Sequence, residues 1–294
     1  MTLLTLPPDW GRCSTNIGNP TGINFGSGVT AGANNADGSA ASVMSALAHD
    51  VEALVIGISG FGNTGGAINP CALLDILVDP AGGTSWSATP LIEDLLVGGT
   101  YPINLQSATV GVGTPLWYFF PIWIPSGTSI GGMARTAHSS TITGRVVIKA
   151  YGENRNPGSW WCGRKVTSIG INAASSRGTD HTPGASSSFS SWANLGSTTS
   201  VDAYAYQWAA QGENDTDWQS TTPSSASPYN FEFGVDSTRI GPPLVKGITA
   251  GEVGASFPLS MAYRHIPAGS QLQVRGAAFG VSPQTIDVAA YLVS

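Results

Sequence analysis

FPIWIPSGTSI, residues 120–130, and AYRHIPAGSQL, residues 262–272, are the two stretches that decide how this chain folds. In each, a strand-like run ends in Ile-Pro-small-Gly, and a new run starts after a Thr or Ser. Proline cannot donate a hydrogen bond within a central strand, and glycine tolerates positive φ. The sequence therefore predicts two matched turns, 124–127 and 266–269, each between two β-strands.

Shorter motifs on both sides of the turns recur in the same order. Val78-Asp79 matches Val235-Asp236, and Tyr151 matches Tyr291. The offset between matched residues drifts only from 140 (Tyr151 to Tyr291) to 157 (Val78 to Val235). An unbroken order at a nearly constant offset is typical of internal repetition. The chain is therefore predicted to hold one domain in two copies.

The segments that follow residue 50 alternate between apolar and polar or small residues, as half-buried strands do. Short strands with turn signals between them predict an all-β fold of two tandem, internally duplicated antiparallel β-sandwich domains. A jelly-roll-like topology is preferred, preceded by a Gly/Ser-rich N-terminal arm. The predicted divisions are 1–48 (arm and loop region of repeat one), 49–152 (first sandwich), 153–200 (linker and loop region of repeat two) and 201–294 (second sandwich).

The composition is poor in charge. Charged residues are 10% of the 294 residues, against about 25% in ordinary soluble domains. The formal net charge of −6 argues against a nucleic-acid partner, which requires clustered Lys and Arg. So few charges leave surfaces weakly hydrated, and such surfaces are commonly covered by protein partners.

The N-terminal residues 1–8 lack the basic and apolar regions of a secretory signal, and no apolar run approaches the roughly 20 residues of a membrane span. The sequence thus predicts synthesis in a cytoplasm, with no membrane partner. Cys13, Cys71 and Cys162 are an odd number at spacings unlike a zinc site, which favours reduced thiols. Pairing of Cys13 with Cys162 across a pseudo-twofold axis stays open.

The sequence contains no recognisable catalytic, phosphate-binding or metal-binding motif. Asp79 and Asp236 are interpreted as turn residues. The acidic cluster 213–217 offers oxygen ligands for Ca²⁺ but lacks the glycine and distal glutamate of a calcium loop, so a solvated loop is predicted. We predict no catalytic residue, cofactor or metal, and no enzyme. A glycan-cleaving enzyme would need two opposed carboxylates, and no such pair is identified.

The run 115–124 is apolar on both faces of the predicted strand, and such a strand must be covered on both sides. The covering element is either another subunit or repeat, or a locally thick core. The candidate interface residues are Leu116, Trp117, Phe119, Phe120 and Trp123.

Three tryptophans in polar surroundings, Trp160, Trp192 and Trp218, could stack on a sugar. Ordinary packing of these rings is the preferred interpretation, and glycan stacking is the alternative.

The two Ile-Pro-[SA]-Gly-[ST] strands, the Val-Asp motifs and the Pro-Leu-[IV] motifs at 90–92 and 243–245 resemble β-sandwich repeats of virion proteins of tailed bacteriophages. The resemblance implies a structural component of the virion, either a capsid-surface decoration or a part of the collar, tail or fibre. It implies assembly with copies of itself, with a trimer as one candidate, and with other virion proteins. The alternative is a carbohydrate-binding adhesin or receptor-binding module directed at a host-surface glycan.

Overall fold

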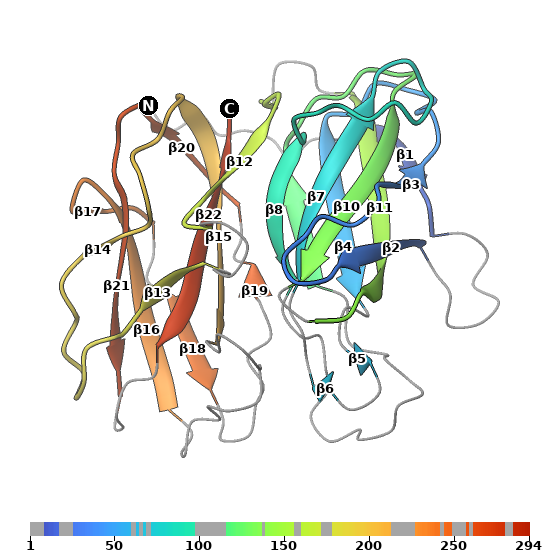
Figure 1. Cartoon of the computed structure of the whole chain (residues 1–294). Coiled ribbons are helices and arrows are strands. Elements are labelled where there is room, and N and C mark those ends of the chain that lie inside the picture. The colour runs from blue at the N-terminus through green and yellow to red at the C-terminus, as the bar shows by residue number, and fades with distance from the viewer. Residues whose placement is uncertain are drawn as a thin grey trace.

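The computed structural model describes residues 9–17, 26–59, 63–64, 67–68, 72–97, 116–136, 139–155, 160–171, 178–212, 227–241, 244–248, 257–258, 261–279 and 285–294. These residues form strands and turns, and no helix occurs among them. The predicted all-β sandwich fold is therefore confirmed. Within the same residues, no helix capable of crossing a membrane is found. Figure 1 shows two lobes side by side, here named the first unit (β1–β11) and the second unit (β12–β22).

Apart from the separate β5–β6 pair, the first unit is one curled sheet in the order β8-β7-β10-β2-β11-β4-β9. Its neighbours are antiparallel except for β2 and β10, while β3 also pairs with β10 and β1 with β11. The sheet curls around an apolar core and brings its two ends together, where the Tyr118 hydroxyl of β9 donates to the Leu96 carbonyl of β8 at 2.6 Å. The strands are β1 (Trp10–Thr15), β2 (Ser27–Gly32), β3 (Ala41–Met44), β4 (Ala53–Ser59), β5 (Asn63–Thr64), β6 (Ala67–Ile68), β7 (Ala72–Asp79), β8 (Ile92–Val97), β9 (Leu116–Phe120), β10 (Ser129–Thr136) and β11 (Ile142–Asn154).

The second unit is a sandwich of two sheets. One contains β20, β15, β22 and β12, and the other contains β14, β21, β16 and β18. The strands are β12 (Val166–Ile169), β13 (Thr179–His181), β14 (Ala193–Asn194), β15 (Ala203–Gly212), β16 (Ser227–Val235), β17 (Thr238–Arg239), β18 (Leu244–Ile248), β19 (Phe257–Pro258), β20 (Ala262–Ile266), β21 (Leu272–Ala278) and β22 (Ile286–Val293).

The β15–β22 pair lies between the two cores. Trp208 of β15 packs into the core of the second unit, whereas Ala209 of β15 and Tyr291 of β22 belong to the core of the first. All eight residues of β22 are buried. A strand covered on both faces has to be apolar nearly throughout, and IDVAAYLV meets that requirement. The two units are thus packed through a shared sheet, and the parallel pair Val166–Ile92 extends the backbone pairing from β12 to β8.

The two predicted turns are built alike. Gly127 and Gly269 have φ of 83° and 85°, in the left-handed region that favours glycine. In each turn the amide of the residue before the glycine donates to an aspartate, Asp50 at 2.7 Å in the first unit and Asp202 at 2.8 Å in the second. The turns therefore have a common design, while the duplication of whole units stays a prediction, because one unit is a single curled sheet and the other is two sheets.

The described part of the predicted N-terminal arm lies within the first sheet. Its strands β1, β2 and β3 pair with β11 and β10, and Val29 and Val43 are buried in the first core. Glycine, serine and alanine hide the alternation in the sequence of β2, SGVTAG, because only Val29 has a large side chain. The described residues of this segment thus contribute strands to the first unit.

Candidate functional site

An aromatic seam runs across the junction between the units. Trp160, from the linker, contacts Trp10 of β1 at 5.5 Å between ring centroids and Phe119 of β9 at 6.0 Å. Its next neighbour is Tyr263 of β20, at 5.5 Å. Trp160, one of the three candidate glycan-stacking tryptophans, thus packs between the two units.

Beside the seam lies an exposed cluster, named here the aromatic patch: Trp161, Tyr204, Tyr263 and His265. Trp161, Tyr204 and Tyr263 are 36%, 45% and 50% exposed. Trp161 contacts Tyr204 at 5.4 Å, and Tyr204 stacks on His265 at 5.0 Å with an interplanar angle of 19°. Large rings are normally covered, so a cluster of exposed ones marks a surface suited to binding.

Charged side chains surround the patch. The His265 ring nitrogen lies 3.7 Å from the Asp202 carboxylate, and Arg264 between Tyr263 and His265 is exposed. Beyond Trp161, the guanidinium of Arg164 lies 3.9 Å from the ring centroid of Trp123. The patch therefore combines flat apolar rings with donors and acceptors at its border.

The predicted interface strand is largely covered by the chain itself. Phe120 is fully buried in the first core, and Phe119 is half-buried in the seam. Trp117 is 39% exposed, with the Lys149 ammonium 5.1 Å from its ring centroid, and Trp123 is half-buried beneath Arg164. The side chain of Leu116 lies outside the described residues. The apolar character of both faces is thus explained by the core on one side and the seam on the other.

The other two candidate tryptophans do not form a site with Trp160 among the described residues. Trp192 lies over Gly234 of β16, with the Arg275 guanidinium 4.5 Å from its ring centroid. Trp218 lies outside the described residues, as do the acidic cluster 213–217 and Cys71. Cys13 and Cys162 are free thiols. Asp79 accepts the amides of Ala81 and Ser85, both at 2.9 Å, as expected of a turn residue.

Sequence reasoning missed a polar cluster at the junction. Between β7 and β8 the register shifts: Leu74 pairs with Leu95, and Ile76 pairs with Ile92. One residue of β7, Asp75, therefore faces two residues of β8, Glu93 and Asp94. We name Glu93–Asp94 the junction bulge. Asp94 has a φ of 50°, a conformation that costs energy in a non-glycine residue. Bulges of this kind re-aim side chains.

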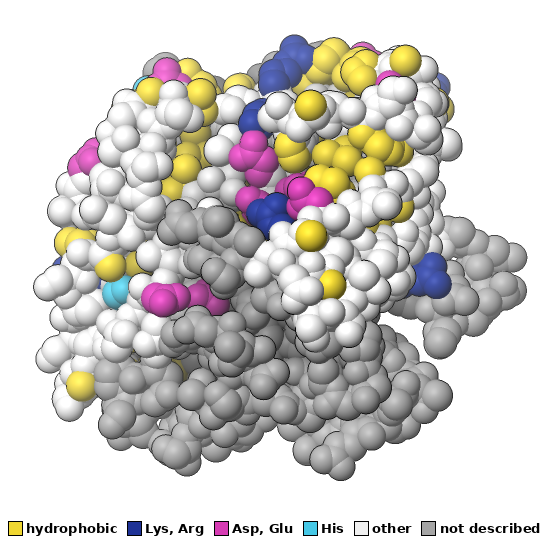
Figure 2. All heavy atoms as spheres, in the orientation of Figure 1, with side chains coloured by type: hydrophobic (Ala, Val, Ile, Leu, Met, Phe, Trp, Pro, Cys, Tyr) yellow, Lys and Arg dark blue, Asp and Glu magenta, His cyan; other side chains and the backbone are white. Residues whose placement is uncertain are grey.

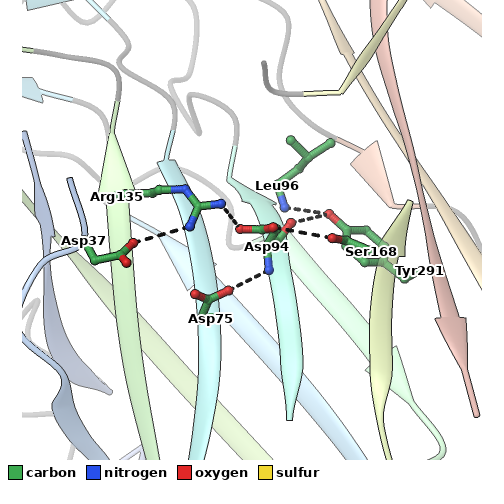
Figure 3. Close-up of polar contacts among 7 residues, drawn as sticks. All are labelled: Asp37, Asp75, Asp94, Leu96, Arg135, Ser168 and Tyr291. Atoms are coloured by element: carbon green, nitrogen blue, oxygen red, sulfur yellow. Dashed lines mark hydrogen bonds and ion pairs between the residues drawn. The ribbon is translucent and has the colours of Figure 1, made fainter. Parts of the chain in front are cut away.

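The bulge connects the two units. The Asp94 amide donates to the Asp75 carboxylate at 2.7 Å, and the Asp94 carboxylate is ion-paired with Arg135. From the second unit, the Tyr291 hydroxyl donates to the Asp94 carbonyl at 3.0 Å, and Ser168 approaches its carboxylate at 3.5 Å. Figure 3 shows Asp94 between Arg135 on one side and Ser168 and Tyr291 on the other. Figure 2 shows acidic and basic side chains gathered where the lobes meet.

Burial dominates the electrostatics of this cluster. It raises the pKa of Asp75 from 3.8 to about 6; the hydrogen bond from the Asp94 amide opposes the rise, and the negative charge of Asp94 adds to it. Burial also raises the pKa of Asp94, against the nearby Arg135. The junction thus holds a carboxyl group that exchanges its proton near pH 6.

Glu232 stands in the second unit where Asp75 stands in the first. Each lies three residues before the Val of a Val-Asp pair, on strands whose pairings correspond: Val78 with Ile130, and Val235 with Leu272. Glu232 faces Arg275 and is ion-paired with it at 2.6 Å, and with Arg239 at 3.0 Å. Burial acts to raise the pKa of Glu232, but the hydrogen bonds from the two arginines outweigh it, and the pKa is lowered.

Asp75 instead faces Met133 across β7 and β10. The two positions therefore differ because one unit supplies a cross-strand arginine and the other does not. A sequence signal existed: Asp75 is a charge in the middle of the apolar run ALLDILVD. No group of His, Cys, Asp or Glu suited to holding a metal ion occurs in the part of the chain that the structure describes.

No family model matches the sequence, and no curated protein matches it. Among solved structures, the chain resembles PNGF-II with a TM-score of 0.40 and 10% identity, covering 87% of this chain and 59% of that one. It resembles a peptide-N(4)-(N-acetyl-β-D-glucosaminyl) asparagine amidase with a TM-score of 0.39 and 8% identity, covering 88% of each chain. It also resembles a structure of infectious bursal disease virus, Gx strain, with a TM-score of 0.25 and 7% identity, covering 84% of this chain and 58% of that one.

The comparison corrects the prediction that the chain is not an enzyme, because an amidase is among the solved structures that it resembles. The chain spans 59% of the length of PNGF-II. At these identities and TM-scores no activity, substrate or partner is transferred to it.

Proposed function

We propose that the chain is a structural component of a tailed-bacteriophage virion that assembles with copies of itself and with other virion proteins. The observation that carries the proposal is the aromatic patch on the edge strand β20, where Tyr263, Arg264 and His265 are all exposed. Tyrosine, tryptophan and arginine are enriched where protein interfaces gain most of their binding energy. The sparse charge of the whole chain supports the same role.

The charges around the patch favour a head-to-tail contact. Arg164 and Arg264 are exposed beside it, while the whole chain carries 18 acidic against 12 basic residues. A twofold contact of the patch with itself would place each copy's Arg264 near its own counterpart. A contact with another, more acidic face of the next copy avoids this repulsion, and such contacts close into a ring where the rotation between copies closes. A trimer is one such ring.

Analytical ultracentrifugation of the full chain tests this proposal. The wild-type protein should sediment as a closed oligomer, and the double variant Tyr204→Ser/Tyr263→Ser as a monomer. Phe189→Ser is the matched control, because Phe189 is 37% exposed on a different surface loop, and it should leave the oligomer intact. A wild-type monomer at the highest soluble concentration, together with absence of the chain from purified particles by mass spectrometry, contradicts the proposal.

Glycan binding at the same patch is the second candidate. It is favoured by the stacked Tyr204–His265 pair with the Asp202 carboxylate beside it, because flat rings can pack on the apolar face of a sugar while the carboxylate accepts from its hydroxyls. Maltohexaose, cellohexaose and chitohexaose are suitable probes, titrated against the intrinsic fluorescence of the chain. Saturable quenching that Tyr204→Ser abolishes and Phe189→Ser retains would support this candidate.

A further inference from the structure

We infer that the junction bulge, Glu93–Asp94, is a pH-sensitive latch between the two units, which holds more tightly when Asp75 is protonated in mildly acidic solution and loosens at neutral pH. This inference is independent of the proposed function, because it rests on the contacts of the junction and not on the aromatic patch.

The latch is built from hydrogen bonds that cross between the units. The Tyr291 hydroxyl donates to the Asp94 carbonyl at 3.0 Å and accepts the Leu96 amide at 2.7 Å. Lys165, just before β12, is ion-paired with Glu93 at 2.5 Å. Asp75 on the neighbouring strand β7 stabilises these contacts, because its carboxylate accepts the Asp94 amide and so holds Asp94 in its left-handed conformation.

The charges around Asp75 are unbalanced. Arg135 is ion-paired with Asp94 and Asp37, and Lys165 with Glu93, so both cations of the cluster are engaged by other carboxylates. No ion pair of Asp75 occurs among the described residues. The groups that face the cluster are Glu93 and Asp94 from β8, Arg135 from β10, Asp37 from the loop after β2, Lys165 from the segment before β12, Ser168 from β12 and Tyr291 from β22.

Protonation changes this balance in one direction. When Asp75 is ionised, its buried charge is poorly solvated; this cost outweighs the favourable hydrogen bond from the Asp94 amide, and opening of the junction to water relieves it. Repulsion from the Asp94 carboxylate adds to the cost. When Asp75 takes up a proton, both costs end, and the carboxyl oxygen can still accept the Asp94 amide. The pKa of about 6 for Asp75 sets the range in which the change occurs. The latch should therefore open more readily as the pH rises through that value.

Hydrogen–deuterium exchange of the full chain measures the opening. Peptides that cover 91–97 and 166–169 would be compared at about pH 5 and about pH 7.5, after correction for intrinsic exchange, and the wild-type opening constant should be about tenfold larger at the higher pH. Asp75→Asn should remove this difference, because the carboxamide is neutral at both values and still accepts the amide.

Glu232→Gln is the matched control, since Glu232 occupies the corresponding position in the second unit but is held by two arginines. It should leave the pH dependence of the 91–97 peptide unchanged. Equal opening of that peptide at both pH values in the wild type, or an undiminished pH difference in Asp75→Asn, would overturn the inference. Thermal melting of each variant shows whether it is folded.

Discussion

The hydroxyl of Tyr291 lies 3.0 Å from the carbonyl oxygen of Asp94, although the two residues are 197 positions apart in the chain. Tyr291 belongs to the last strand, and its ring packs against Tyr118 and Phe120 of the first unit. The last strand of the chain thereby closes the core of the first unit as well as that of the second. This relationship makes the junction both a packing element and a polar contact.

Tyr291→Phe separates these two contributions. The ring should keep its packing, while the Leu96 amide and the Asp94 carbonyl lose their partner in a buried site. We expect the free energy of unfolding to fall by about 1–3 kcal/mol, measured by urea denaturation. Tyr151→Phe is the control, since this ring lies near the surface at the far side of the seam, and it should change stability less. Equal effects of the two variants would count against the polar role of Tyr291.

Asp75→Asn should stabilise the protein at neutral pH. The pKa of Asp75 is raised from 3.8 to about 6 by folding, so its contribution to stability is fully present below the lower value and is lost as the pH rises through the higher. Removing the charge should therefore raise the free energy of unfolding by on the order of 2 kcal/mol at pH 7 and by almost nothing at about pH 4. Melting temperatures across this range give the measurement, and a destabilised variant at pH 7 would contradict the assignment.

Glu232→Gln should destabilise the protein at neutral pH, the opposite of the effect expected for Asp75→Asn. The pKa of Glu232 is lowered from 4.5, so its contribution is present above that value and is lost as the pH falls through the lowered one. Loss of the charge weakens the hydrogen bonds from Arg275 and Arg239, and we expect a destabilisation of about 1–3 kcal/mol at pH 7. The same melting series tests it. Identical pH profiles for this variant and Asp75→Asn would refute the contrast between the two positions.

Gly127→Ala and Gly269→Ala should lower the free energy of unfolding by the same amount. Nothing lies within 4 Å of a Cβ built on either glycine, so the cost comes from the left-handed backbone alone. We expect a loss of roughly 1–2 kcal/mol in each variant. Urea denaturation of the two proteins side by side gives the comparison, and clearly unequal losses would show that the turns differ despite their matching φ values.

The position of the turns and the all-β class could be predicted from the sequence, because proline and glycine act locally and alternation reports directly on strand faces. The register of the matched motifs is less well predicted. Tyr151 pairs with Ala53, three residues after the turn-binding Asp50, and Val293 pairs with Ala205, three residues after the turn-binding Asp202. Counted from the turns, the position of Tyr151 is that of Val293, two residues beyond the Tyr291 that the sequence match selects. A shift of two residues keeps every side chain on the same face, so alternation does not detect it.

The run 115–124 is apolar on both faces in the sequence and therefore needs cover on both sides. What covers its described part depends on the fold: Phe120 is buried in the first core, and a linker tryptophan packs on Phe119. The fold also places the final strand between the two cores. It also decided that Asp75 meets Asp94 without an arginine opposite, while Glu232 meets Arg275. The reason is physical: burial and charge pairing arise from residues far apart in the chain, and no local pattern reports which of them become neighbours.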